Sequence, residues 1–386
     1  MDSKKIIELE KEYIMPTYGR LAVVLEHGNG CYLFDKEGNR YLDLVGSLAT
    51  SPIGYGNEEF AKMLFQQSKK LVNATNLFYT EQQAVLAEKL SKISGLKKSF
   101  FSNSGSEANE VAIKLARKYT KKTEIIAAEK AFHGRTFGAL TATWNKKYKD
   151  YCKPLVPDFK HIPYNNPEAL EKAITDKTAA FIVEPIQGES GIIVPDDDYL
   201  KQVSEICQKN DVLLIADEIQ TGMRTGKFFA YQHNKILPDI VTVAKGIAGG
   251  VPLGATTAKE EIANSFEKGE QGSTFGGNSL SCCAANFIID YVLKNKLVEN
   301  AKKQGDYFFK KLNELKNEKK SVKEARGKGL MIGIELNRES KEVVELCLKK
   351  KLLVNKCTDS VIRFLPPLVI SGNEIDKAIG ILEEVL

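Results

Sequence analysis

The sequence of 386 residues predicts an α/β fold, with a large and mostly parallel sheet flanked by helices and a smaller α+β domain. Three observations lead to this prediction. Between residues 50 and 285, helical patterns alternate with short apolar runs, which are typical of strands buried on both faces. Such alternation is typical of crossover helices that cover a parallel sheet. After residue 286, charged helical patterns interleave with the apolar runs 331–336 and 361–365, which indicates a second, smaller domain.

The predicted elements follow in chain order. Residues 1–49 predict a helix and then a hairpin, with strands at 31–35 and 40–44, and we assign them with residues 286–386 to the small domain. The large domain, residues 50–285, has a helix that begins near Ser106, because small and aliphatic residues recur after it at helical spacing. Its clearest strands are 180–183, 212–216 and 239–244.

Composition limits the classes of function. The 55 basic and 50 acidic residues leave a net charge of +5, which is too even for a nucleic-acid-binding protein. No apolar run is long enough to span a bilayer, and the N-terminus lacks the apolar region of a signal peptide. The seven cysteines form no C-x-x-C motif, so we expect them to be reduced in a cytoplasmic protein that has no metal site and binds no membrane.

Two apolar runs of the large domain each end in one charged side chain. Asp217 ends the run that begins at Leu214, and Lys245 follows the run 239–244. The carboxyl ends of such strands face the crevice where open α/β sheets bind ligands. A buried lysine there has a lowered pKa, so its free amine can form an imine, and an aspartate beside it can hold a proton on a pyridine nitrogen. Together they point to pyridoxal 5'-phosphate (PLP).

Two glycine-containing segments are candidates for holding a phosphate. Gly105 and Ser106 open a helix whose first N–H groups can bind an anion, although alone they fit an ordinary serine cap better. The loop 272–278 could also surround a phosphate, but it matches neither the P-loop nor the dinucleotide motif, and alone it predicts a flexible turn.

Other side chains near predicted strand ends suit substrate or ring contacts. Phe132 could stack on a flat ring, and Arg135 could grip a carboxylate with two hydrogen bonds. We expect His133, which lies between them, to be structural. Glu189 follows a buried strand and is a candidate partner for an arginine that must at times be neutralised, with a plain surface turn as the alternative.

In this order and spacing, the motifs resemble the class III aminotransferases, PLP-dependent enzymes of fold type I, from about Tyr18 to Arg363. Within that family, the segments 76–81, 132–136 and 363–367 are most similar to the acetylornithine aminotransferases. This resemblance implies transfer of the terminal amino group of N-acetylornithine to 2-oxoglutarate, in arginine biosynthesis. The products would be N-acetylglutamate semialdehyde and glutamate.

The resemblance also implies roles at matching positions. Lys245 would hold PLP and act as the general base, while Asp217 would pair with the ring nitrogen. The remaining cofactor contacts would come from Gly105, Ser106, Phe132, Glu218, Ile219, Gln220 and, from a second subunit, Thr274. The last contact implies a homodimer with shared active sites.

For the substrates, the resemblance implies that Arg135 binds the α-carboxylate of the ω-amino donor, with help from Ser273 and Tyr18. Arg363 would receive the carboxylate of glutamate or 2-oxoglutarate, and Glu189 would mask it when the ω-amino substrate is bound. One pocket would thereby serve two substrates.

Several alternatives remain open. Ornithine aminotransferases usually have a tyrosine where this chain has Leu48, and an aliphatic residue suits an acylated nitrogen better. Succinyl-diaminopimelate and 4-aminobutyrate are further candidate substrates. The Glu189 switch disfavours a glutamate semialdehyde aminomutase, and two carboxylate grips disfavour a PLP-binding module without turnover. The chain also departs from the family in a loop one residue short between Met223 and Arg224, and in Tyr55, where a histidine is common.

Overall fold

The computed structural model describes all 386 residues, and its largest sheet confirms the predicted fold class. Seven strands lie in the order β4-β10-β9-β8-β7-β5-β6. Their bounds are β4 (Lys98–Ser102), β5 (Glu124–Ala128), β6 (Phe159–Ile162), β7 (Thr178–Val183), β8 (Leu213–Asp217), β9 (Ile240–Val243) and β10 (Gly254–Ala258). The pairs from β6 to β9 are parallel, and β10 alone runs antiparallel to its two neighbours. The strands predicted at 180–183, 212–216 and 239–244 are therefore present.

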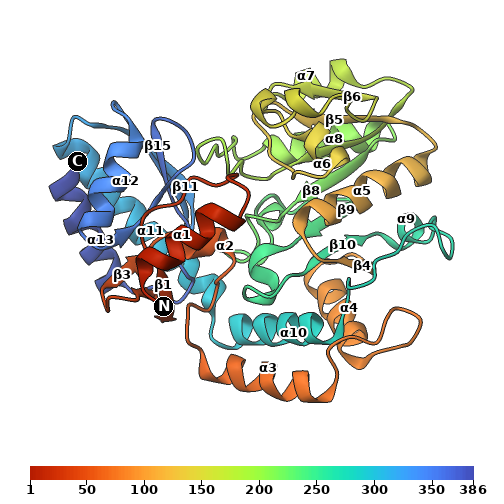
Figure 1. Cartoon of the computed structure of the whole chain (residues 1–386). Helices are drawn as coiled ribbons and strands as arrows, with labels where there is room; N and C mark the ends of the chain where they lie inside the picture. The colour runs from red at the N-terminus through yellow and green to blue at the C-terminus, as the bar shows by residue number, and fades with distance from the viewer.

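Helices cover both faces of this sheet (Figure 1). Because side chains alternate along a strand, Ala180 and Ile182 of β7 pack in one apolar cluster with α5 (Gly105–Thr120), and Phe181 and Val183 pack in another with α8 (Tyr199–Lys209). The other helices of this part are α3 (Glu58–Lys70), α4 (Glu81–Ser94), α6 (Phe137–Ala142), α7 (Pro167–Ala173), α9 (Glu260–Ala263) and α10 (Ser279–Lys294). The core strands are thus buried on both sides, as their continuous apolar sequence predicts.

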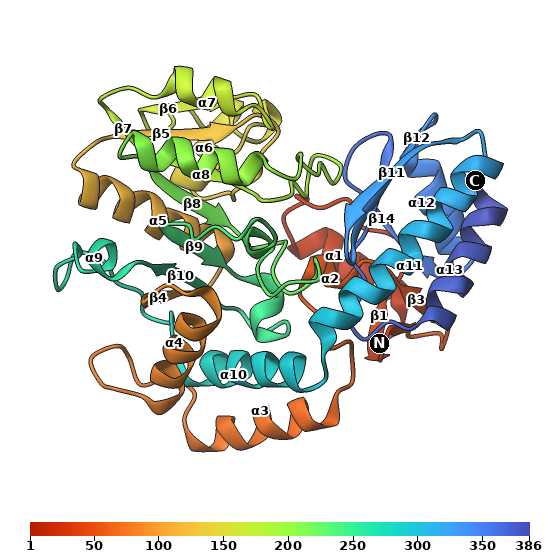
Figure 2. The same cartoon turned by 180° about the vertical axis from the view of Figure 1, so that it is seen from behind.

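The two ends of the chain lie together on one side of the molecule (Figures 1 and 2). One sheet has the order β1-β2-β3-β13, and another has the order β11-β12-β15-β14. The strands are β1 (Leu25–Asn29), β2 (Tyr32–Asp35), β3 (Arg40–Asp43), β11 (Val322–Lys328), β12 (Met331–Leu336), β13 (Leu352–Leu353), β14 (Asn355–Lys356) and β15 (Val361–Phe364). The parallel pairing of β3 with β13 joins the predicted N-terminal hairpin to the C-terminal part. The domain boundaries themselves stay a prediction.

The remaining helices are α1 (Ser3–Tyr13), α2 (Gly46–Ala49), α11 (Leu297–Glu318), α12 (Ser340–Lys349) and α13 (Gly372–Val385). None of the helices combines the length and the apolar character needed to cross a membrane. All seven cysteines are free, and Cys282 is buried in α10. The sequence had not indicated β1, which adds a strand to the edge of the hairpin.

Candidate active site

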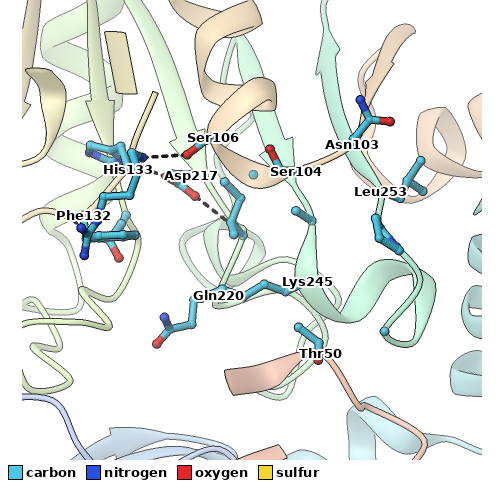
Figure 3. Close-up of a pocket in the computed structure, with 18 of the residues that line it drawn as sticks. Thr50, Asn103, Ser104, Ser106, Phe132, His133, Asp217, Gln220, Lys245 and Leu253 are labelled. Carbon is cyan, nitrogen blue, oxygen red and sulfur yellow. Dashed lines mark hydrogen bonds and ion pairs between the residues drawn. The ribbon is translucent and has the colours of Figure 1, made fainter. Parts of the chain in front are cut away.

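A cavity of about 410 Å³ lies at the carboxyl ends of the central parallel strands (Figure 3). The loops that follow β4, β5, β7, β8 and β9 all contribute to its wall. This is the crevice expected for a ligand in an open α/β sheet. Eight of the predicted site residues line it, namely Gly105, Ser106, Phe132, Arg135, Asp217, Ile219, Gln220 and Lys245.

Lys245 lies two residues after the end of β9 and is half-buried in the cavity wall. Its φ of 49° is in the left-handed region, which is costly for a residue with a side chain and is concentrated at functional sites. Burial lowers the pKa of Lys245 to about 8, and the nearby charges of Glu189 and Asp217 only partly oppose this. About a tenth of such amines are neutral at pH 7, so the group can act as a nucleophile or a base.

Asp217 ends β8 and is only 3% exposed. Its Oδ2 accepts a hydrogen bond from Asn109 Nδ2 at 2.8 Å and lies 2.7 Å from His133 Nδ1. Its Oδ1 accepts from the Ile219 backbone N–H at 3.1 Å. Asn109 is fixed in turn, because its Oδ1 accepts from Thr242 Oγ1 at 2.8 Å. The carboxylate is therefore held in one orientation at the cavity wall, where it can pair with a cationic ring nitrogen.

His133 does more than the structural part expected from the sequence. Its ring nitrogen contacts Asp217 directly, although 84 positions separate the two residues in the chain. The other ring nitrogen, Nε2, is buried without a partner. The backbone N–H of His133 donates to Thr143 Oγ1 at 2.9 Å, which anchors the loop. We conclude that His133 positions the aspartate, and only the fold brings them together.

The N-terminus of α5 forms another part of the wall. Ser104 caps this helix by accepting from the Glu107 N–H at 3.2 Å, while the first N–H groups of the helix have no partner within it. A Cβ on Gly105 would lie 2.8 Å from Ile219 Cδ1, so glycine permits the close packing. Ser106 Oγ accepts from the Arg135 N–H at 2.8 Å. Free N–H groups, a hydroxyl and the helix dipole together suit a phosphate.

Phe132 and Arg135 stand on the loop that follows β5. The Phe132 N–H donates to Glu184 Oε1 at 2.9 Å. Burial raises the pKa of Glu184 to about 7, although the charge of His133 acts in the opposite direction. The guanidinium of Arg135 makes no hydrogen bond or ion pair within the chain. Its Cζ lies 3.8 Å from the ring centre of Tyr148 and 5.5 Å from that of Phe132.

Arg363, on β15, is 1% exposed and pairs with Glu189 Oε1 at 2.6 Å. Its Nη1 also donates to Gln220 Oε1 at 3.1 Å and to the Gly188 carbonyl at 3.2 Å. Gln220 Nε2 donates to the same Glu189 oxygen at 3.1 Å. Burial tends to raise the pKa of Glu189, but the charges of Arg363 and Lys245 outweigh it and lower the pKa. The arginine beside the cavity is therefore neutralised by a carboxylate of the same chain.

Six predicted residues do not line this cavity. Glu189 and Arg363 lie beside it, next to Gln220 of the wall, and the other four are Tyr18, Thr274, Ser273 and Glu218. Tyr18 is 74% exposed, and the guanidinium carbon of Arg20 lies 5.4 Å from its ring centre. Thr274 is exposed, and Ser273 Oγ accepts from the Gly276 N–H at 2.9 Å beside a separate cavity. Glu218 points away, because its Oε1 accepts from the Tyr231 N–H at 2.9 Å in a buried network where burial raises its pKa to about 7. In a single chain, these four side chains therefore lie away from the cavity wall.

The residues at the two departures from the family pattern are hydrogen-bonded within the chain. Arg224, next to the short loop, is buried, its Nη1 donates to the Leu330 carbonyl at 3.1 Å, and burial lowers the arginine pKa to about 9. Tyr55 donates its hydroxyl to Asp43 Oδ2 at 2.6 Å, and Asp43 accepts from the Gly46 N–H at 3.0 Å. Tyr55 therefore supports the turn that carries Leu48. Neither Arg224 nor Tyr55 lines the cavity.

Comparison with known proteins gives a consistent result. The family pattern described as aminotransferase class-III matches residues 13–386. The acetylornithine aminotransferase of Methanothermobacter thermautotrophicus is 48% identical over 387 residues, covering 100% of this chain and 99% of the relative. That of Methanocaldococcus jannaschii is 45% identical over 396 residues, with coverage of 100% and 98%.

Solved structures agree. The ornithine aminotransferase of Toxoplasma gondii superposes with a TM-score of 0.96 at 30% identity, covering 100% of this chain and 95% of that one. The acetylornithine aminotransferase of Elizabethkingia anophelis gives a TM-score of 0.89 at 34% identity, with coverage of 100% and 99%.

Proposed function

Since the chain belongs to the class-III aminotransferase family and is a PLP-dependent transaminase, we propose that it transfers the terminal amino group of N-acetylornithine to 2-oxoglutarate. The observation that carries this proposal is one cavity with Lys245, Asp217 and Arg135 at its wall and a second arginine, Arg363, beside it. Arg135 is free, and Arg363 is masked by Glu189. Relatives named acetylornithine aminotransferase, at 48% and 45% identity over the whole chain, support the choice of substrate.

The residues of the cavity fit PLP. The N-terminus of α5 with Ser106 suits the phosphate, Phe132 offers an aromatic face to the ring, and Asp217 is fixed where it can hold a proton at the ring nitrogen. When bound, PLP supplies an electron sink for the carbon that bears the substrate amine. Glu218 is a weaker candidate contact, since its side chain is engaged elsewhere.

The chain's own groups then move the proton. With its pKa lowered to about 8, the amine of Lys245 would take the proton from the amine-bearing carbon of the substrate and hold it for return during the same half-reaction. Asp217 would hold a proton at the ring nitrogen of bound PLP, which would strengthen the electron sink that PLP supplies. His133 and Asn109 hold the aspartate in the required orientation.

Two carboxylate sites allow one cavity to take two substrates in turn. Arg135 would bind the carboxylate far from the reacting amine in both. Glu189 would stay on Arg363 while N-acetylornithine is bound, and it would move away when glutamate or 2-oxoglutarate brings a second carboxylate. Ping-pong kinetics follow, because the amino group stays on the enzyme between the two half-reactions.

Ornithine is the second candidate substrate, favoured by the TM-score of 0.96 with the Toxoplasma gondii enzyme. Leu48 argues against it. This residue lies in the turn that Tyr55 and Asp43 hold, two positions before Thr50 of the cavity wall. A free α-ammonium near an aliphatic side chain loses hydration without a compensating partner, whereas an acetyl group does not.

A homodimer with shared sites completes the proposal. Thr274 is exposed in one chain, and large apolar side chains near it are also exposed, namely Leu77, Phe78, Tyr79 and Phe275. Contiguous exposed apolar surface is typical of an interface. Ser273 and Tyr18 would meet substrate in that assembly. We also propose a cytoplasmic location, in line with seven free cysteines, and a step of arginine biosynthesis.

Isotope tracing tests the reaction. N-acetylornithine carrying heavy nitrogen only at its terminal amine is incubated with 2-oxoglutarate, and glutamate is examined by mass spectrometry. We expect the label in glutamate with the wild-type enzyme and not with Lys245→Ala. Label transfer from ornithine but not from N-acetylornithine would overturn the substrate, and no transfer from any ω-amino donor would overturn the reaction.

A further inference from the structure

We propose that Tyr148 is a positioning residue that holds Arg135 ready to bind the substrate carboxylate far from the reacting amine. The proposal rests on the function given above only for the group that Arg135 binds. Tyr148 ends the short 3-10 helix at Lys146–Tyr148 and is not among the residues that line the cavity. It acts through the arginine.

The contact itself is specific. The Cζ atom of Arg135 lies 3.8 Å from the centre of the Tyr148 ring, which is stacking distance for a planar guanidinium. The side chain of Arg135 makes no hydrogen bond or ion pair in the chain, and only its backbone N–H is engaged, by Ser106 Oγ. Aromatic faces are therefore the contacts that restrain this long and exposed side chain.

This restraint leaves the arginine able to bind. A guanidinium has five N–H donors, and stacking on a ring occupies none of them. A carboxylate partner would neutralise the charge and compete with substrate, as Glu189 does at Arg363. An arginine without any partner would lose side-chain freedom on binding, at a cost in affinity. Tyr148 avoids both disadvantages.

Tyr148 is itself held in place. Its N–H donates to the Asn145 carbonyl at 3.1 Å, and the next residue, Lys149, donates from Nζ to the Thr143 carbonyl at 2.6 Å. Thr143 also accepts from the His133 N–H, so the turn is tied to the loop that carries Arg135. The Tyr148 ring meets Phe132 edge-on at 6.1 Å between centres. The ring is thus part of a fixed support.

Steady-state kinetics of the holoenzyme test this support. We expect Tyr148→Leu to raise KM for N-acetylornithine and for 2-oxoglutarate by about threefold to tenfold, with kcat within about twofold of wild type. Tyr148→Phe keeps the ring and should keep both KM values within about twofold. Tyr151→Leu, at an exposed tyrosine three positions on that does not contact Arg135, serves as the matched control. Equal losses in the Phe and Leu variants would assign the effect to the hydroxyl and overturn the proposal.

A double-mutant cycle identifies the residue through which Tyr148 acts. In an Arg135→Ala background, Tyr148→Leu should cause no further rise in KM. A rise as large as in the wild-type background would show that Tyr148 acts independently of Arg135 and would overturn the proposal.

Binding of glutarate, a dicarboxylate that cannot be aminated, separates this proposal from the proposed reaction. Calorimetric titration of the holoenzyme should give a Kd about threefold to tenfold higher for Tyr148→Leu than for Tyr148→Phe. This result would stand even if N-acetylornithine proved not to be a substrate. Identical Kd values in the two variants would overturn the support by Tyr148, whatever the turnover.

Discussion

The cofactor end and the substrate end of the cavity are built differently. At the cofactor end, Asp217 and Lys245 follow neighbouring parallel strands, and hydrogen bonds from Asn109 and the Ile219 N–H fix the carboxylate. At the substrate end, Arg135 stacks on an aromatic ring, and the predicted substrate contacts Tyr18 and Ser273 lie outside the cavity of a single chain.

We therefore expect the cofactor end to set the rate of the chemical steps and the substrate end to set the selectivity between substrates. Groups that take part in proton transfer need fixed geometry, which strand ends and buried networks supply. Groups that must accept two substrates need a partner that can be exchanged. Arg363 combines both features, because it is buried and rigid but is neutralised by a carboxylate on a loop. Substitutions at the two ends should therefore produce different kinetic signatures.

The largest loss should come from the base at the cofactor end. Lys245→Ala removes the amine that we propose as the general base, and we expect kcat to fall by about 10² to 10⁴-fold or more. Single-turnover rates with N-acetylornithine measure this loss, and circular dichroism checks the fold. Lys268→Ala, at an exposed lysine, is the control and should match wild type. Activity of Lys245→Ala within tenfold of wild type would remove the lysine from the mechanism.

The second largest loss should come from Asp217→Asn. We expect kcat/KM to fall by about 10² to 10³-fold, because a preorganised charge is lost from the site proposed for the ring nitrogen. The same assay on His133→Gln should show a smaller loss, about tenfold, since the aspartate keeps its other donors. A larger fall in kcat/KM for His133→Gln than for Asp217→Asn would contradict a role of His133 in positioning Asp217.

Selectivity should change when the mask at the substrate end is removed. Glu189→Gln leaves Arg363 charged and unneutralised, so an uncharged part of N-acetylornithine would face a bare cation. We expect the ratio of kcat/KM for N-acetylornithine over glutamate to fall by about tenfold to a hundredfold, the range for a hydrogen bond to a charged group. An unchanged ratio would show that the observed Glu189–Arg363 pair has no part in selectivity.

A smaller effect concerns pH. In the proposed site, PLP is attached through the neutral amine of Lys245, and burial lowers the pKa of this amine to about 8. The rate at which the apoenzyme takes up PLP should therefore rise as pH increases, and it should level off above about 8. Absorbance changes after mixing at a series of pH values measure this rate. A rate that climbs steadily towards pH 10 would indicate an amine that is not perturbed.

The cofactor end could be predicted in large part from the sequence, for a physical reason. An apolar strand that ends in one charged residue gives a local signal, and parallel strands bring such ends together. Glu218 stays a predicted cofactor contact, although its side chain lies in a buried network. Its direction follows from the strand, because adjacent side chains at a strand end point to opposite sides and Asp217 already faces the cavity.

The rest depends on contacts that no local pattern reports. His133 reaches Asp217 across 84 positions, and the ring of Tyr148 meets Arg135 from a separate turn. Histidine and tyrosine in those segments have no periodic or spacing signal that distinguishes them from core residues. The contacts proposed for Thr274 and Ser273 would require the proposed second subunit, which a single chain does not contain.

The most direct test of the central claim is an absorbance record of the purified enzyme through successive additions of N-acetylornithine and 2-oxoglutarate. We expect an absorbance band near the visible edge that bleaches when N-acetylornithine is added and returns when 2-oxoglutarate is added, which would show that both half-reactions occur in one site. A band that bleaches only with free ornithine or 4-aminobutyrate would contradict the substrate, and the absence of any band after PLP is added would contradict the cofactor site itself.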